Sequence, residues 1–299
     1  MSCFHPLTAY RTRGGDVTFR QGLGVGLSFS LPCGQCIGCR LERSRQWAMR
    51  CLHESKLHQD NCFITLTYSD SFLPANGSLV KADFQRFIKR FRKRIAPCKI
   101  RFFHCGEYGG QFSRPHYHAL IFGYDFPDKI IASQGDNPTY TSAILAKLWP
   151  LGDPFQQRVG ALTFESAAYV ARYAMKKITG QAAKAYYERV NVETGEIISL
   201  QPEYITMSLK PAIGKVFYQR FSSDFFPSDF CVVRGVKCRP PRYYDKLFGV
   251  DHPDVLERIK LKRIRFASRF KADFTSARLA DREQVTAARV SQLKRKLEV

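Results

Sequence analysis

The sequence lacks the features that would place the protein in or across a membrane. It has no run of about 18 apolar residues, the length that a transmembrane helix needs. Its first residues show no charged segment followed by an apolar stretch, so we expect no secretory signal peptide. Internal repeats and low-complexity stretches are missing as well. These absences predict a globular protein that works in the cytoplasm without a membrane partner.

Acidic residues are scarce relative to basic ones. The chain of 299 residues has 47 Lys and Arg against 26 Asp and Glu, which gives a net charge of +21. Such a surplus costs self-repulsion and is typical of proteins that bind a polyanion, most commonly nucleic acid. The alternative is a generally basic protein without such a partner. The apolar fraction of 44% and the aromatic fraction of 13% are high enough for a packed core, which excludes a largely disordered chain.

Disulfide bonds are not expected, although the chain has ten cysteines. Without a secretion signal the expected environment is a reducing cytoplasm, where thiols bind metal or are simply buried. Three thiols recur at a tight spacing in Cys33-x-x-Cys36-x-x-Cys39. Zinc is the metal that this spacing favours, and a closed structural zinc site needs a fourth ligand.

For the fourth ligand we favour Cys3, ahead of His5 and Cys51. An iron–sulfur cluster would require another cysteine soon after Cys39, but position 43 is Arg. The alternative interpretation is a set of small thiols buried in a glycine-rich loop without any metal.

The middle of the chain alternates between strand-like and helix-like patterns. Runs of β-branched and aromatic residues predict strands, and apolar residues spaced three and four apart predict amphipathic helices. In chain order we expect a strand over 62–68, a helix over 81–95, strands over 99–108 and 116–122, a helix over 141–149, a strand over 159–164 and a helix over 165–178. This β-α-β-β-α-β order predicts an α+β fold of the ferredoxin or RRM type, an antiparallel sheet with helices on one face.

Four segments are expected along the chain. Residues 1–60 form a Cys-rich segment and a helix that begins near Arg40, residues 61–180 the core, residues 181–250 a poorly defined α/β extension, and residues 251–299 a basic helical tail. The tail could be a solvated helical face, a DNA-binding arm or a partly disordered segment.

The most informative segment is His116-Tyr117-His118 in the predicted strand 116–122. Because side chains alternate along a strand, His116 and His118 face one side and Tyr117 faces the other. Glu107 ends the partner strand, across a glycine-rich turn, and can come alongside the two histidines. Two imidazoles and a carboxylate can bind one divalent metal and leave positions open for phosphate oxygens and water. The alternative is a chance pair of histidines on a solvated strand.

Two tyrosines follow on the predicted helix 165–178. Tyr169 and Tyr173 share a helix face, and Arg172 and Lys176 each lie three residues after one of them. A phenol is a weak nucleophile near neutral pH because its pKa is about 10, but nearby cations favour the phenolate. Attack of the phenolate on a phosphate gives a covalent phosphotyrosine ester. The alternative is a pair of core aromatics.

A histidine pair on a strand, an upstream Glu and a helical tyrosine pair followed by Lys resemble the HUH endonucleases. More closely, the chain resembles the replication initiators of the Microviridae, small phages with single-stranded DNA, and among them those of the gokushoviruses. The resemblance covers roughly residues 1–180, in Pro32 to Arg40, Phe63 to Tyr68, Cys105 to Gly109, Arg114 to Gly123 and Phe164 to Lys177.

The resemblance implies a replication initiator for rolling-circle replication of a bacteriophage genome. Glu107, His116 and His118 would hold Mg²⁺ or Mn²⁺. Tyr169 and Tyr173 would act in alternation as nucleophiles that nick one DNA strand and later rejoin it. Single-stranded DNA and origin DNA would be the partners, together with a helicase or polymerase of the host, in the cytoplasm of the bacterial host.

Three other functions stay open from the residues alone. A single-strand transposase or relaxase uses the same chemistry at another DNA element. A metal hydrolase would activate water at the histidine pair, but it would need further ligands. A non-catalytic DNA-binding protein would stack its tyrosines on bases. Capture of a covalent protein–DNA adduct separates the enzymes that use a tyrosine from the other two classes.

Overall fold

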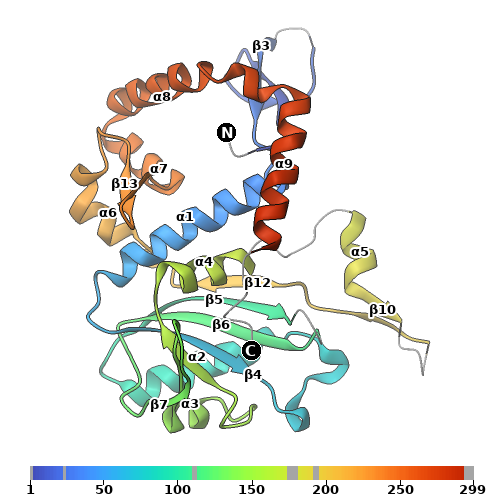
Figure 1. Cartoon of the computed structure of the whole chain (residues 1–299), viewed down its shortest axis with the longest axis vertical. Coiled ribbons are helices and arrows are strands. Elements are labelled where there is room, and N and C mark those ends of the chain that lie inside the picture. The colour runs from blue at the N-terminus through green and yellow to red at the C-terminus, as the bar shows by residue number, and fades with distance from the viewer. Residues whose placement is uncertain (1–2, 23–24, 110–112, 174–180, 191–194, 293–299) are drawn as a thin grey trace. The chain divides into compact units, whose positions relative to one another are not determined.

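The computed structural model describes residues 3–22, 25–109, 113–173, 181–190 and 195–292. The chain forms two compact units, one of Met1–Arg43 with Asp245–Arg295 and one of Ser44–Tyr244 with Lys296–Val299. The elements of each unit are drawn in Figure 1. The four-segment division expected from the sequence stays a prediction.

The second unit is built on an antiparallel sheet whose order follows from the β-α-β-β-α-β pattern. Its strands lie in the order β12-β5-β6-β4-β9-β8-β7. The four central strands β5, β6, β4 and β9 have the ferredoxin-like order, in which the first strand lies between the third and the fourth. The bounds are β4 Asn61–Thr67, β5 Arg101–Tyr108, β6 Pro115–Phe122, β7 Ile130–Ser133, β8 Thr139–Thr141, β9 Arg158–Ala161 and β12 Tyr204–Met207.

One face of this sheet is covered by the two helices that the sequence predicts within the core. Helix α2, Lys81–Ile95, buries Phe84, Phe87, Ile88 and Phe91, whose spacing of three and four residues places them on one side of the helix. Helix α3, Ala143–Leu148, begins at an N-cap serine whose hydroxyl accepts a hydrogen bond from a backbone amide of the first turn. The α+β fold with helices on this face is therefore confirmed.

The opposite face of the sheet is covered as well, and this was not predicted. Helix α4, Phe164–Tyr173, and the second half of helix α1, Ile37–Ser55, pack on Phe63, Phe103 and Leu120. These three side chains belong to the strand positions that alternate with those beneath α2. Any side chain on this face of the sheet therefore lies under helices rather than in open solvent.

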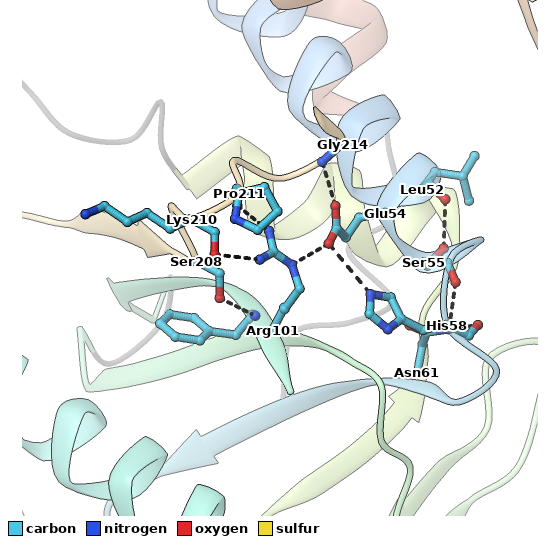
Figure 2. Close-up of polar contacts among 11 residues, drawn as sticks. Leu52, Glu54, Ser55, His58, Asn61, Arg101, Ser208, Lys210, Pro211 and Gly214 are labelled. Carbon is cyan, nitrogen blue, oxygen red and sulfur yellow. Dashed lines mark hydrogen bonds and ion pairs between the residues drawn. The ribbon is translucent and has the colours of Figure 1, made fainter. Parts of the chain in front are cut away.

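A buried ion pair fixes the end of α1 to the sheet (Figure 2). Glu54 is almost fully buried, and its carboxylate accepts a hydrogen bond from Arg101 on β5 at 2.5 Å and one from the Gly214 amide at 2.7 Å. Arg101 also donates to the carbonyl of Pro211 at 2.5 Å. Burial alone would raise the pKa of Glu54, but hydrogen bonds, led by that from His58, outweigh it and lower the pKa. The network joins α1, β5 and the loop after β12.

Short elements complete the second unit beyond the core. Strand β10 pairs with β11 and strand β13 with β14, so that each pair forms a small antiparallel hairpin. The bounds are α5 Gln181–Tyr187, β10 Glu188–Val190, β11 Ile197–Ser199, α6 Lys215–Phe221, β13 Cys231–Val233, β14 Val236–Cys238 and the 3-10 turns Asp70–Phe72, Ala75–Gly77 and Ser222–Asp224.

The first unit holds a three-stranded antiparallel sheet that the sequence did not indicate. Strands β1, Leu7–Thr12, β2, Val17–Thr18, and β3, Val25–Leu31, pair in the order β2-β1-β3. Leu27 is 93% exposed, so apolar residues in this sheet do not mark a buried face. The periodicity from which a strand is predicted is therefore missing.

The C-terminal segment is helical, as expected, but interrupted. Helix α7, Arg242–Asp251, is followed by α8, Pro253–Ser268, by the 3-10 turn η4, Lys271–Phe274, and by α9, Ser276–Ser291. Proline at the start of α8 suits the first helical turn, where its missing amide hydrogen costs nothing. In the described part of the chain, no helix combines the length and the apolar character needed to cross a membrane.

Candidate metal and nucleophile site

Strand pairing brings Glu107, His116 and His118 together on one face of the sheet. Glu107 lies directly opposite His116 in the β5–β6 register, and His118 is two residues further along β6. The Oε1 atom of Glu107 is 2.8 Å from Nε2 of His116 and 2.8 Å from Nε2 of His118. We call these three residues the Glu-His-His group. Within the described residues, their ligand atoms form one of two groups whose members all lie within 4.8 Å of one another.

The hydrogen bonds around His116 fit a cation between the ligand atoms. Its Nδ1 atom lies 3.0 Å from the carbonyl oxygen of Arg114, which can only accept, so Nδ1 carries the hydrogen. In the neutral ring the Nε2 atom is then a lone pair, and it faces the carboxylate of Glu107. Two acceptors at this distance repel unless a proton or a metal ion joins them. Two ligands of one octahedral Mg²⁺ lie about 3 Å apart, close to the separation seen here.

Burial and charge hold Glu107 ready as an anionic ligand. Only 1% of its surface is exposed. Burial would raise its pKa, but the hydrogen bonds from His116 and His118 outweigh this effect and lower the pKa to about 2. Its carboxylate is therefore ionised near neutral pH. His118 is equally buried and His116 is partly exposed, so a phosphate would reach the group from the His116 side.

Thr65 is a residue of this site that the sequence analysis missed. It lies opposite His118 in the β4–β6 register, and its hydroxyl is 2.9 Å from Nδ1 of His118. A partner on the second ring nitrogen fixes the orientation of a metal-binding histidine and the nitrogen that it offers. Thr65 could be found only from the register between β4 and β6, which are distant in sequence.

Tyr117 lies on the other face, as the alternation of the strand predicts. It is fully buried, and its hydroxyl pairs with the hydroxyl of Tyr68 at 2.7 Å, with the carbonyl of Val80 at 2.9 Å and with the Val80 amide at 3.1 Å. Burial raises the pKa of Tyr117 to about 12, so it stays neutral. A bulky polar side chain at the centre of the histidine pair is thus accommodated, because its hydroxyl has partners.

Of the two predicted nucleophiles, Tyr169 packs against the Glu-His-His group. Its ring centroid is 5.0 Å from that of His118 and 6.2 Å from that of Phe63, both in edge-to-face contact. Only 3% of its surface is exposed. The guanidinium of Arg172 lies 5.8 Å from the ring centroid, within cation–π range.

Tyr173 is the last residue of α4, one helical turn after Tyr169. Its side chain, and the whole of Lys176, lie outside the described residues.

The second group of close ligand atoms is formed by Cys3, Cys33, Cys36 and Cys39, which we call the four-cysteine group. Of the three candidates for the fourth position, the structure brings Cys3 to the others. His5 is instead exposed and 2.6 Å from Glu283. Cys51 is buried with residues of the sheet.

Comparisons with known proteins match this arrangement of sheet and site. The family of the replication-associated protein ORF2 matches residues 61–178, which include every strand that carries the Glu-His-His group and helix α4 up to its end. Replication-associated protein VP4 of Bdellovibrio phage phiMH2K is 32% identical, over 85% of this chain and 79% of its own. Replication-associated protein ORF2 of Spiroplasma virus 4 is 30% identical, over 93% and 91%. A search of solved structures found no match.

The chain therefore belongs to the replication-associated proteins of the Microviridae. The replication-associated protein ORF4 of Chlamydia phage 1 is a further relative, 26% identical over 74% of this chain and 54% of its own. The resemblance noted from the sequence is confirmed.

Proposed function

We propose that this protein initiates rolling-circle replication of a small phage genome by nicking one DNA strand with a tyrosine. The observation that carries the proposal is the convergence of three ligand atoms beside a buried tyrosine. Glu107, His116 and His118 offer one oxygen and two nitrogens at a single point, and the ring of Tyr169 lies against His118. Kinship with phage replication-associated proteins supports replication as the process.

The chemistry follows from the donor set and the phenols. The tyrosine oxygen forms a bond to phosphorus while the bond from phosphorus to the 3′ oxygen breaks. The phenol proton is lost to solvent, and the leaving 3′ oxygen takes a proton from water. The products are a 5′-phosphotyrosine ester and a free 3′ hydroxyl. The ester conserves the energy of the broken bond, so the reverse reaction rejoins the strand without a cofactor.

The Glu-His-His group would hold Mg²⁺ or Mn²⁺. Such a cation supplies charge stabilisation to a phosphate whose oxygens gain negative charge. Glu107 neutralises part of the ion's charge from a buried position, and the two histidines fix where the phosphate can lie. Thr65 and the Arg114 carbonyl hold the two rings so that both Nε2 atoms face the same point. The four-cysteine group takes no part in this reaction.

The two tyrosines would have different roles. Tyr169 is packed against His118 and Phe63, whereas Tyr173 follows one turn later. We propose that Tyr173, with Lys176 three residues after it, makes the first nick. Tyr169 would then cut the regenerated origin, so that the released strand is joined into a circle. Arg172, beside the Tyr169 ring, would favour the phenolate there.

The electrostatic surplus supports single-stranded DNA and origin DNA as the substrates, with host helicase or polymerase as further partners. A net charge of +21 favours phosphate binding that does not depend on sequence. A transposase or relaxase would use the same residues on other DNA, so only the substrate distinguishes it.

The test is cleavage of single-stranded oligonucleotides tiled across the genome that encodes the protein, in Mn²⁺ and in Mg²⁺. We expect one oligonucleotide to be cut, leaving a 3′ hydroxyl and a 5′ end bound to protein. The variant H116A should not cut it. The variant H252A serves as the matched control, because His252 is an exposed histidine outside the sheet, and it should cut normally. Cutting of every oligonucleotide by water, with no protein bound, would instead favour a metal hydrolase.

A further inference from the structure

Four thiols from separate segments meet in the unit formed by Met1–Arg43 and Asp245–Arg295. Cys3 precedes the first strand, Cys33 and Cys36 lie in the loop after β3, and Cys39 is in the first turn of α1. Their sulfur atoms all lie within 4.8 Å of one another, and those of Cys3 and Cys36 are 3.9 Å apart. Four sulfurs around a tetrahedral zinc ion, each at about 2.3 Å, would be separated by about 3.8 Å. The spacing of the group is therefore that of a closed zinc site.

Backbone amides point at three of these sulfurs. Cys33 Sγ accepts from the amides of Gln35 at 3.4 Å and of Cys36 at 3.3 Å. Cys3 Sγ accepts from the Cys33 amide, and Cys36 Sγ from the Phe4 amide, each at 3.3 Å. Amides directed at sulfur favour the anionic thiolate, which is the form that binds metal.

A tight turn is needed to aim two amides at Cys33. Gly34, the residue after Cys33, has a φ of +76°, a conformation that residues with a Cβ rarely adopt. The turn places the amides of residues 35 and 36 over the sulfur of residue 33. A loop that merely buries thiols in an apolar core has no need of this arrangement, so the turn speaks for a bound ion.

The group is closed on its outer side by the C-terminal helices. Leu279 of α9 is buried against it, together with Phe4, and Phe274 of η4 and Ile37 of α1 pack at its edge. Apolar walls and four protein ligands leave no position for substrate or water, which is the arrangement of a structural zinc site rather than a catalytic one.

We infer that Cys3, Cys33, Cys36 and Cys39 bind one Zn²⁺ ion, which ties the N-terminal segment to the start of α1 and forms the base on which α9 packs. Two of these segments are about 30 residues apart in sequence, and α9 lies at the other end of the chain. The three parts meet at the sulfurs and their apolar neighbours. Binding of the ion therefore contributes to folding of this unit.

The first test measures metal in the full chain after purification under reducing conditions in metal-free buffer. We expect about one zinc per chain. The variants C36S and C39S should lose it, whereas C98S, which changes an exposed cysteine outside the group, should keep it. The variant H118A should also keep it, which assigns the ion to the cysteines and not to the Glu-His-His group. A folded, reduced wild-type protein without zinc, or one that holds iron, would overturn the inference.

A second measurement covers the case in which C36S fails to fold. The wild-type protein is treated with a mercurial that displaces zinc from thiolates, and zinc release is followed together with limited proteolysis. We expect zinc to appear as the thiols react, and new cleavage within 275–292, because α9 loses its base. Replacement of zinc by Co²⁺ should give the visible absorption of a tetrahedral thiolate site. Reaction of all four thiols without release of zinc, or an octahedral cobalt spectrum, would contradict a four-cysteine site.

Discussion

The Glu-His-His group and the four-cysteine group are held by different parts of the polypeptide. The first lies on adjacent strands of a seven-stranded sheet, so strand register places its donor atoms. The second joins a loop, a helix start and an N-terminal segment that are not neighbours in any sheet or helix. The sheet can hold its site without metal, whereas the thiols come together only when the fold around them is complete. The comparison teaches that similar spacing of ligand atoms serves two purposes, chemistry in one unit and folding in the other.

The largest effect is expected from removal of a ligand in the sheet. H118A removes a nitrogen at the point where Glu107 and His116 converge, so strand cleavage should become undetectable, and EDTA should do the same to the wild type. DNA binding should largely persist, since basic residues supply most of it. Gel shifts beside cleavage assays check both. H118A that still cuts in EDTA would remove the distinction between the two groups.

The tyrosines should show the next largest effect. Y173F should nearly abolish the first nick, and Y169F should nick but fail to release unit-length circles. The double variant should do neither. Y186F, a change at an exposed tyrosine of α5, is the matched control and should behave as the wild type. Time courses on labelled DNA follow each step. A severe first-nick defect in Y169F with a mild one in Y173F would reverse the assignment.

A smaller effect is expected at Thr65, whose hydroxyl orients His118. T65V keeps the shape but loses this contact, and the loss of such a partner typically lowers metal affinity or activity by about 10-fold to 100-fold. We expect a higher Mn²⁺ concentration to recover part of the rate, and T65S to behave as the wild type. Titration of the cleavage rate with Mn²⁺ measures it. A uniform loss that neither T65S nor added Mn²⁺ restores would indicate a packing role.

The smallest effect concerns the charge of the cysteine-containing unit. Arg258, Lys262 and Arg265 are exposed on one face of α8. Their change to Gln should lower the slope of log affinity against log salt by about 0.7 for each lost contact with single-stranded DNA. Replacement of the two arginines by Lys, which keeps the charge, is the control. An unchanged slope would make α8 a solvated face and confine DNA binding to the other unit.

The core of the fold could be predicted because its patterns are local. Helix α2 has the expected bounds, since Phe84, Phe87 and Phe91 repeat with the helix period and are buried. The sheet order follows from the sequence of elements. Strand β12 was missed because its only partner among the described strands, β5, lies about 100 residues earlier. Strand β3 was missed because apolar Leu27 is exposed, which hides the alternation.

The same distinction applies to the sites. His116 and His118 could be paired from the alternation of one strand, and Glu107 from a hairpin. Thr65 required the pairing of β4 with β6, which only the folded sheet supplies. Cys3 was one of three candidates for the fourth thiol position, because contact between segments about 30 residues apart is decided by packing and not by spacing. Interactions within an element or a hairpin can be predicted from sequence, and those between distant segments cannot.

The central claim is that a tyrosine beside the Glu-His-His group becomes covalently joined to DNA. The most direct measurement incubates the protein with the single-stranded origin and Mn²⁺, denatures it in SDS, digests it and identifies the nucleotide-bearing peptide by mass spectrometry. We predict a 5′-phosphotyrosine on Tyr173, with Tyr169 labelled in Y173F only when the DNA carries a regenerated origin. Cleavage of the origin with no nucleotide on either tyrosine would mean that water is the nucleophile, and it would contradict the proposed function.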